Sequence, residues 1–248
     1  MDIAVCLCFV PDTASVIGFS DQTSELLRVN EVINPYDEYA LEEAVRLKER
    51  FEGSRVTVFT VSPVSAKDML RKALAMGADR AVLVTRTMVL DPYQTAIALN
   101  HSISDFYAGT LPDLVFCGKQ STDFQHGQVP PMLAELLGMG AVTGICALHV
   151  STEGLEVERE IESGVEFFEL HYPALLSVEK GLNTPRKTSI KSVMEARKKT
   201  IDFFSLSFHE PPSVVMTGIK PCSRKKRCRF ISDEKELIKV LRKELFLP

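Results

Sequence analysis

Short apolar runs alternate with longer amphipathic segments along the first 145 residues of the chain. Each apolar run is too short for a buried helix and ends at a polar or proline-containing turn, which is typical of a buried strand. Strands are therefore expected at residues 3–10, 55–61, 81–85 and 113–117.

The segments between these strands have the spacing of amphipathic helices, at residues 37–50, 65–76 and 91–107. The first helix begins with acids and ends with Lys48 and Arg50, an order that suits the helix dipole. Gly77 follows the second helix, and Asp91-Pro92 is an N-cap followed by proline at the first helical position.

Strands that alternate with helices of this length require right-handed crossovers. We therefore expect an α/β fold with a doubly wound, mostly parallel, Rossmann-like sheet. A hairpin excursion is expected at residues 14–33, and short strands with polar turns at residues 147–150, 155–159 and 165–170 predict an antiparallel addition. Residues 173–178 read as another buried strand.

The pattern changes after Gly181. A Lys/Arg-rich helix is expected near residues 193–199 and a closing helix near 232–245. This last part has little evident core, and we expect it to leave Phe203, Phe204, Leu206 and Leu245 exposed. We therefore expect it to wrap around another surface.

Composition and charge narrow the class of partner. The 248 residues carry a net charge of −4 and are 45% hydrophobic, so the chain has no overall attraction for nucleic acid or anionic lipid. The basic run at residues 223–227 lacks interleaved aromatic residues and is expected in the C-terminal arm instead. No apolar run approaches the roughly 20 residues of a membrane span.

The cysteines and histidines give no metal signature. The six cysteines form no CxxC pair, and the five histidines have no ligand spacing. Buried reduced thiols are expected, in a cytoplasmic or otherwise reducing compartment. No nucleophile-elbow motif occurs, so we expect no catalytic residue.

The loop from Gly118 to Pro131 is the best candidate for binding chemistry. It follows an expected strand and precedes an expected helix, where unpaired backbone N–H groups of a parallel sheet can hold a phosphate. Gly127 would let a phosphate approach the backbone. An ordinary glycine-containing turn would have the same pattern, since neither a P-loop nor GxGxxG is present.

Several stretches, taken in order and spacing, resemble the electron-transfer flavoprotein β-subunit family from end to end. They are Val10-Pro11-Asp12, residues 33–44, residues 73–80, Gly118-Lys119-Gln120, Gln128, and Leu182-Asn183 with Pro185-Arg186.

The resemblance implies an adenine nucleotide at the carboxyl edge of the sheet, either a structural AMP or, in an electron-bifurcating branch, a second FAD. The redox FAD would be held mainly by the α subunit, with Tyr36 at an aromatic position facing its ring. The implied nucleotide-binding residues are Cys6, Asn34, Pro35, Tyr36, Asp37, Val61, Gly118, Lys119, Gln120, Ser121, Thr122, Asp123, Phe124, Gln125, His126, Gly127, Gln128 and Val129.

The resemblance also implies three parts. These are a nucleotide-binding α/β domain at residues 1–180, a partner-recognition loop and helix at 181–200, and an arm at 201–248 that docks on the α subunit. Ile190 falls where the family places an apolar anchor for the partner dehydrogenase, and Leu182 and Pro185 belong to the same partner-binding segment.

The sequence departs from the family pattern at several positions. Phe124-Gln125-His126 replaces an acid-rich run, Pro130 a frequent glycine, and Lys191 a frequent proline, while Phe9 stands where a basic residue is common. Fewer acids would suit phosphate charge, whereas Phe124 would crowd the nucleotide.

The resemblance implies a carrier that passes electrons from a flavin dehydrogenase, such as an acyl-CoA dehydrogenase, to a quinone reductase or another acceptor. The chain itself would position cofactors and select partners without being an enzyme. Alternatives are an electron-bifurcating version, a non-redox adenine-nucleotide sensor and, with the weakest support, a nucleotide-dependent transferase.

Overall fold

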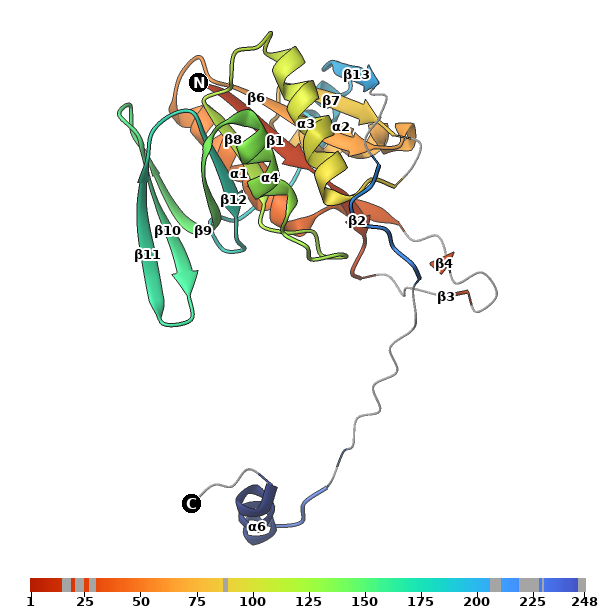
Figure 1. The fold of residues 1–248 in the computed structure, drawn as a ribbon, viewed down its shortest axis with the longest axis vertical. Coiled ribbons are helices and arrows are strands. Elements are labelled where there is room, and N and C mark those ends of the chain that lie inside the picture. Colours follow the sequence, from red (N-terminus) through yellow and green to blue (C-terminus); the bar gives the residue numbers. More distant parts are fainter. Residues whose placement is uncertain are drawn as a thin grey trace.

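A nine-stranded sheet organises the chain, in the order β11-β10-β9-β12-β8-β1-β6-β7-β13 (Figure 1). The computed structural model describes residues 1–14, 19–20, 25–26, 30–86, 89–205, 211–218, 228 and 230–244. The α/β class and the mostly parallel sheet predicted from the sequence are confirmed. The parallel strands are β1 (Asp2–Leu7), β6 (Arg55–Ser62), β7 (Arg80–Thr85), β8 (Leu114–Gly118), β9 (Gly140–Val150), β12 (Ala174–Val178) and β13 (Ile201–Ser205).

The expected antiparallel addition is present at one side of the sheet. β10 (Leu155–Ile161) pairs antiparallel with both β9 and β11 (Gly164–Leu170). Two small ribbons lie near the amino end of the chain. They are β2 (Phe9–Pro11) with β5 (Glu31–Ile33), and β3 (Phe19–Ser20) with β4 (Glu25–Leu26).

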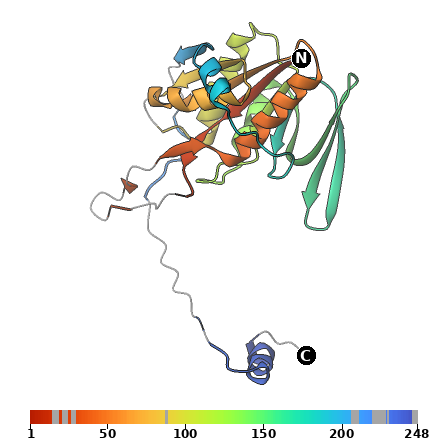
Figure 2. The same cartoon turned by 180° about the vertical axis from the view of Figure 1, so that it is seen from behind.

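Helices cover both faces of the sheet. α1 (Pro35–Arg50), the short 3-10 helix η1 (Val64–Ala66) and α2 (Lys67–Met76) lie on one face, with α5 (Ile190–Ala196) packed on α2 (Figure 2). α3 (Pro92–Phe106) and α4 (Val129–Leu137) cover the other face (Figure 1). α6 (Glu234–Glu244) stands away from the sheet in both views. In the part of the chain that the structure describes, every helix is too short or too polar to cross a membrane.

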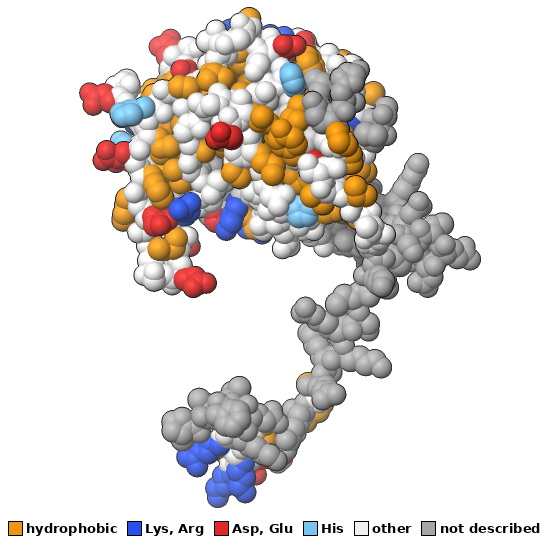
Figure 3. Space-filling model, in the orientation of Figure 1, with side chains coloured by type: hydrophobic (Ala, Val, Ile, Leu, Met, Phe, Trp, Pro, Cys, Tyr) orange, Lys and Arg blue, Asp and Glu red, His pale blue; other side chains and the backbone are white. Residues whose placement is uncertain are grey.

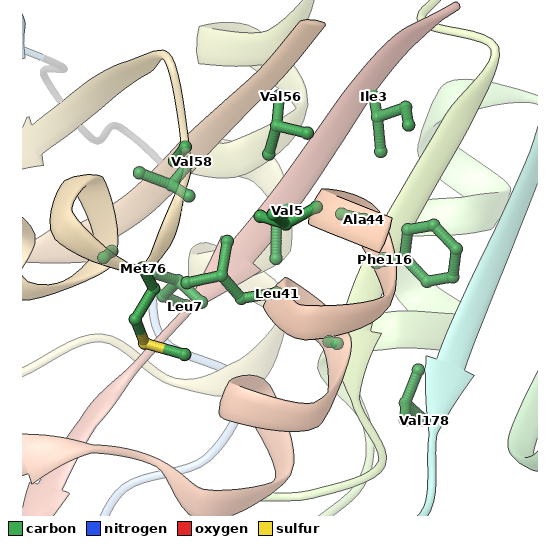
Figure 4. Packing of buried hydrophobic residues seen from close by; sticks show 14 of the residues in the cluster. Ile3, Val5, Leu7, Leu41, Ala44, Val56, Val58, Met76, Phe116 and Val178 are labelled. Carbon is green, nitrogen blue, oxygen red and sulfur yellow. The ribbon is translucent and has the colours of Figure 1, made fainter. Parts of the chain in front are cut away.

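The alternation of side chains along β1 explains why this strand is apolar from Ile3 to Leu7. Ile3, Val5 and Leu7 pack toward α1 and α2, where Leu41 and Met76 meet them (Figure 4). Ala4 and Cys6 belong to the second cluster, beneath α3 and α4. A central parallel strand is buried on both faces, so neither set of alternate positions can be polar.

The last strand of the sheet was not predicted from the sequence. β13 pairs parallel with β7, Ile201 packs against the first cluster and Phe204 against the second. The expectation that Phe204 lacks a core is therefore wrong, whereas Phe203 is exposed. The alternation of side chains in a segment as short as β13 does not show which strand it pairs with. Leu206, Leu245 and the basic run at 223–227 lie outside the described residues.

Candidate functional site

A cavity of about 510 Å³ opens at the carboxyl edge of β1, β6, β7 and β8. This is the edge at which open α/β sheets bind ligands. Of the residues predicted to bind a nucleotide, those lining it are Cys6, Asn34, Asp37, Val61, Gly118, Gln120, Ser121, Asp123, Phe124, His126, Gly127, Gln128 and Val129.

Five other predicted residues lie in the same region without lining the cavity: Pro35, Tyr36, Lys119, Thr122 and Gln125. The Lys119 ammonium turns toward Glu179, at 2.5 Å, and the Lys180 ammonium lies 4.9 Å from the centre of the Tyr36 ring. These side chains form a separate polar group at the end of β12.

The buried Asp37 carboxylate joins the ends of two neighbouring strands. Its Oδ2 accepts the backbone N–H of Cys8 at 2.7 Å, and its Oδ1 accepts the backbone N–H of Gly118 at 3.0 Å. The interruption between β1 and β2 falls at Cys8, whose N–H is taken by this carboxylate. Asp37 therefore fixes where the central strands end and the site loops begin.

Asn34 continues this network into the loop that follows β8. Its side-chain amide donates to Asp37 Oδ1 and to the Gln120 carbonyl, both at 3.0 Å. Its Oδ1 accepts the Thr122 N–H at 3.2 Å. Asn34 and Asp37 therefore hold the loop that follows β8 in place through these hydrogen bonds.

Gly118 is required by the close approach of this loop to α1. A Cβ atom built on Gly118 would lie 2.7 Å from the Cβ of Tyr36 and in collision with Asp37 Oδ1. No larger residue fits without moving the start of α1.

The loop between β8 and α4 turns through two residues with positive φ. Gln125 has φ of 56° and Gly127 of 63°, and the Gln125 N–H donates to the Ser121 carbonyl at 3.1 Å. Glycine is favoured at such a φ because it has no Cβ. Pro130 and Pro131 lie in the first turn of α4 and have no N–H groups, so the backbone donors available at this point come from the loop more than from the helix.

Comparison with known proteins matches residues 25–208 to the electron transfer flavoprotein domain. The electron transfer flavoprotein subunit β of Thermoanaerobacterium thermosaccharolyticum is 42% identical over 203 residues, covering 80% of this chain and 76% of that protein. The subunit β of Bacillus subtilis is 40% identical over 178 residues, covering 71% and 67%. This chain belongs to the electron transfer flavoprotein β-subunit family.

A third protein similar to this chain, Protein FixA of Bradyrhizobium diazoefficiens, is 33% identical to it over 262 aligned residues. That alignment covers 98% of this chain and 90% of FixA. Similarity to FixA therefore extends through the C-terminal segment, beyond the part that the domain match covers.

Sequence reasoning missed the far wall of the cavity in this flavoprotein subunit. Arg86 follows β7, Asp91 caps α3, and Pro92 and Thr95 lie in the first turn of α3. The Asp91-Pro92 pair predicts only the start of a helix. This pair also follows a strand of the parallel sheet. Because ligands bind at the carboxyl ends of such strands, the same rule that indicates the Gly118 loop indicates this position too.

The predicted partner-binding segment is tied to α1. The Arg186 guanidinium pairs with Glu42 at 2.8 Å and with Glu49 at 2.5 Å, and the Asn183 amide donates to the Tyr39 carbonyl at 2.9 Å. The segment with Leu182 and Pro185 leads to Ile190, which is 87% exposed at the start of α5.

The described residues contain no group of three metal-ligating side chains. The thiols that line the cavity, Cys6, Cys8 and Cys117, are free. Burial and the neighbouring Asp37 carboxylate raise the pKa of the Cys8 thiol well above its ordinary value, so this thiol is not an activated nucleophile.

Burial raises the pKa of Asp37 from 3.8 to about 6, although hydrogen bonds from Cys8, Asn34 and Gly118 act against this rise. The folded chain therefore binds the Asp37 proton more tightly than the unfolded chain does. The resulting stabilisation is complete below pH 3.8 and is lost as the pH rises through about 6.

We predict that the stability advantage of the unaltered chain over Asp37→Asn shrinks by about 1–3 kcal/mol as the pH rises from 4 to 7. Urea unfolding of both proteins at several pH values measures this difference. Because the other titrating groups are shared, their contributions cancel. An advantage that stays constant or grows with pH contradicts the assignment.

Proposed function

We propose that this chain is the β subunit of a heterodimeric carrier that holds an adenine nucleotide in the cavity while its α subunit holds the redox FAD. The single observation that supports this proposal best is the 510 Å³ cavity beside the Gly118 loop, in a member of the flavoprotein family. The proposed donor is a flavin dehydrogenase such as an acyl-CoA dehydrogenase, and the proposed acceptor a quinone reductase or another oxidant.

The residues of the cavity fit a nucleotide. Cys6 and Val61 give apolar surface at the strand ends, and Ser121, Gly127 and Gln128 give polar groups in the loop. Arg86 supplies the cationic guanidinium among the described lining residues; burial lowers its pKa, although Glu31 acts in the opposite direction. We place the phosphate beside the loop, where backbone N–H groups and the Ser121 hydroxyl can donate hydrogen bonds to it, whereas Arg86 lies across the cavity at the end of β7.

The chain needs no acid or base of its own for this role. Electron transfer requires the flavin, which supplies the redox chemistry when bound in the α subunit. The β subunit would position the partner surfaces and keep the nucleotide as part of the folded structure. A cytoplasmic location, expected from the cysteine pattern of the sequence, is part of this proposal.

A bifurcating version would place a second FAD in the same cavity, and a nucleotide sensor would need no flavin partner. The exposure of Ile190 on a segment held by Arg186 favours a protein that docks with others over a sensor acting alone.

We predict that Gly127→Val weakens adenine-nucleotide binding by about tenfold or more, because a β-branched residue strains the left-handed backbone that shapes the loop. Gly138→Val is the matched control. Gly138 has φ of 66° at the end of α4, and a Cβ there would meet open space. Both variants carry similar backbone strain, but only Gly127 lines the cavity.

Isothermal titration with AMP, after thermal unfolding has shown that each variant is folded, measures the contrast. Equal loss of AMP affinity in the two variants would show that the effect comes from general strain and that the loop is not the phosphate site.

We predict that Ile190→Ala raises the carrier concentration needed for half-maximal electron delivery by roughly five- to a hundredfold. Removing an anchoring aliphatic side chain costs about 1–3 kcal/mol of docking free energy. The flavin content and absorbance spectrum should not change, since Ile190 does not line the nucleotide cavity.

Ile161→Ala is the control for Ile190→Ala, because Ile161 is an exposed isoleucine at the end of β10, away from α5. Steady-state rates with the cognate dehydrogenase measure both. An unchanged half-saturation value for Ile190→Ala would show that the dehydrogenase docks elsewhere.

A further inference from the structure

A segment near the C-terminus of the chain, residues 211–218, forms part of the wall of the cavity. Pro212, Val214, Val215 and Met216 from this segment line it. Figure 1 shows the segment in blue, running beside the end of α3 that carries Asp91. We call it the crossing segment.

Asp91 holds the crossing segment with one oxygen of its carboxylate. Oδ2 accepts the backbone N–H groups of Ser213 at 2.5 Å and of Val214 at 3.1 Å. Oδ1 accepts the Gln94 N–H at 2.7 Å, which caps α3. One buried carboxylate therefore ties the crossing segment to the first turn of α3.

The charge state of Asp91 suits this double role. Burial raises its pKa, but the hydrogen bonds from the backbone N–H groups of Gln94, Val214 and Ser213 outweigh burial, and the net pKa lies below the ordinary value. Hydrogen bonds to an ionised acceptor are stronger than neutral ones.

The apolar side chains of the crossing segment are largely exposed to solvent. Val214, Val215 and Met216 are 57%, 67% and 58% exposed, although all three line the cavity. Val89, Leu90 and Leu99 line the cavity as well, beside β7 and α3. Apart from Arg86, Asp91 and Thr95, the cavity on this side is lined by apolar side chains, and the flat face of a base would cover those of the crossing segment.

We propose that the crossing segment is part of the nucleotide-binding site and that Asp91 is the positioning residue that holds it against the base. The proposal rests on the proposed function, since it requires a nucleotide in this cavity. The phosphate end would contact the loop after β8, and the base would contact Val214, Val215 and Met216. Departure of the nucleotide would then require the crossing segment to separate from Asp91.

Two substitutions break the contact from opposite sides. Asp91→Asn retains an N-cap residue of similar quality for α3. Its amide N–H₂ would face the N–H groups of Ser213 and Val214, in place of an acceptor. Val214→Pro removes one of these donors and leaves Asp91 and α3 unaltered. Ser213→Ala is the control, because the Ser213 side chain does not line the cavity and the substitution keeps the backbone N–H that Asp91 accepts.

The experiment measures the release of radiolabelled AMP from the complete heterodimer after addition of excess unlabelled AMP. We expect Asp91→Asn and Val214→Pro to release AMP roughly tenfold faster or more, and Ser213→Ala to release it at the rate of the unaltered protein. Thermal unfolding midpoints show whether each variant remains folded.

The outcomes separate this proposal from the proposed function. If the unaltered heterodimer neither contains nor binds an adenine nucleotide, the proposed function fails and this proposal fails with it. If it binds AMP but both variants release AMP at the unaltered rate, only the role of the crossing segment is overturned. Fast release from Asp91→Asn alone would assign the effect to α3 and would also overturn the proposal.

Discussion

The site depends on one buried carboxylate, that of Asp37, which accepts backbone N–H groups from the ends of β1 and β8. A buried carboxylate without partners costs several kcal/mol, so these donors, together with the Asn34 amide, are what allow Asp37 to stay inside the protein. In return, Asp37 fixes the position of the loops that leave both strands. Gly118 completes the arrangement because no side chain fits between the loop and α1.

The two walls of the cavity are built in a similar way. On one side, Asp37 and Asn34 hold the Gly118 loop from behind through backbone groups. On the other side, Asp91 holds the crossing segment through the N–H groups of Ser213 and Val214. In both cases a carboxylate near the start of a helix organises a segment distant in sequence. Figure 3 shows the side of the molecule on which α3 and α4 cover the sheet, where hydrophobic side chains lie among scattered charged ones.

Much of the fold could be predicted from the sequence because a sheet covered on both faces requires continuous apolar strands separated by amphipathic helices. The buried side chains of Ile3, Val5 and Leu7 in β1 are an example of such a continuous apolar strand. β13 could not be predicted in the same way, since Ile201 and Phe204 are buried only through their pairing with β7. β1 was expected to continue to residue 10, but the Asp37 carboxylate takes the Cys8 N–H, an interaction that the local pattern does not contain.

The candidate site was predicted on the β8 side, where Gly127 and the strand-to-helix spacing carry a local signal. Lys119 was expected at the nucleotide but pairs with Glu179, a contact between residues far apart in sequence. The sequence does not identify the β7 side as a wall of the cavity, because Asp91-Pro92 is fully explained locally as an N-cap followed by proline. The position of Val214 and Met216 beside the cavity could not be predicted from the sequence. Nothing in the residues around them indicates which strand ends they cross.

The proposed role of the β subunit is to keep an adenine nucleotide in this cavity while the redox FAD belongs to the α subunit. Co-purification with the α subunit, followed by acid extraction and quantification of FAD and AMP per heterodimer, tests it most directly. We expect one FAD and one AMP per heterodimer for an ordinary carrier, or two FAD for a bifurcating one, and a colourless isolated chain. A heterodimer with a single FAD and no AMP, or an isolated chain that binds FAD stoichiometrically, would contradict it.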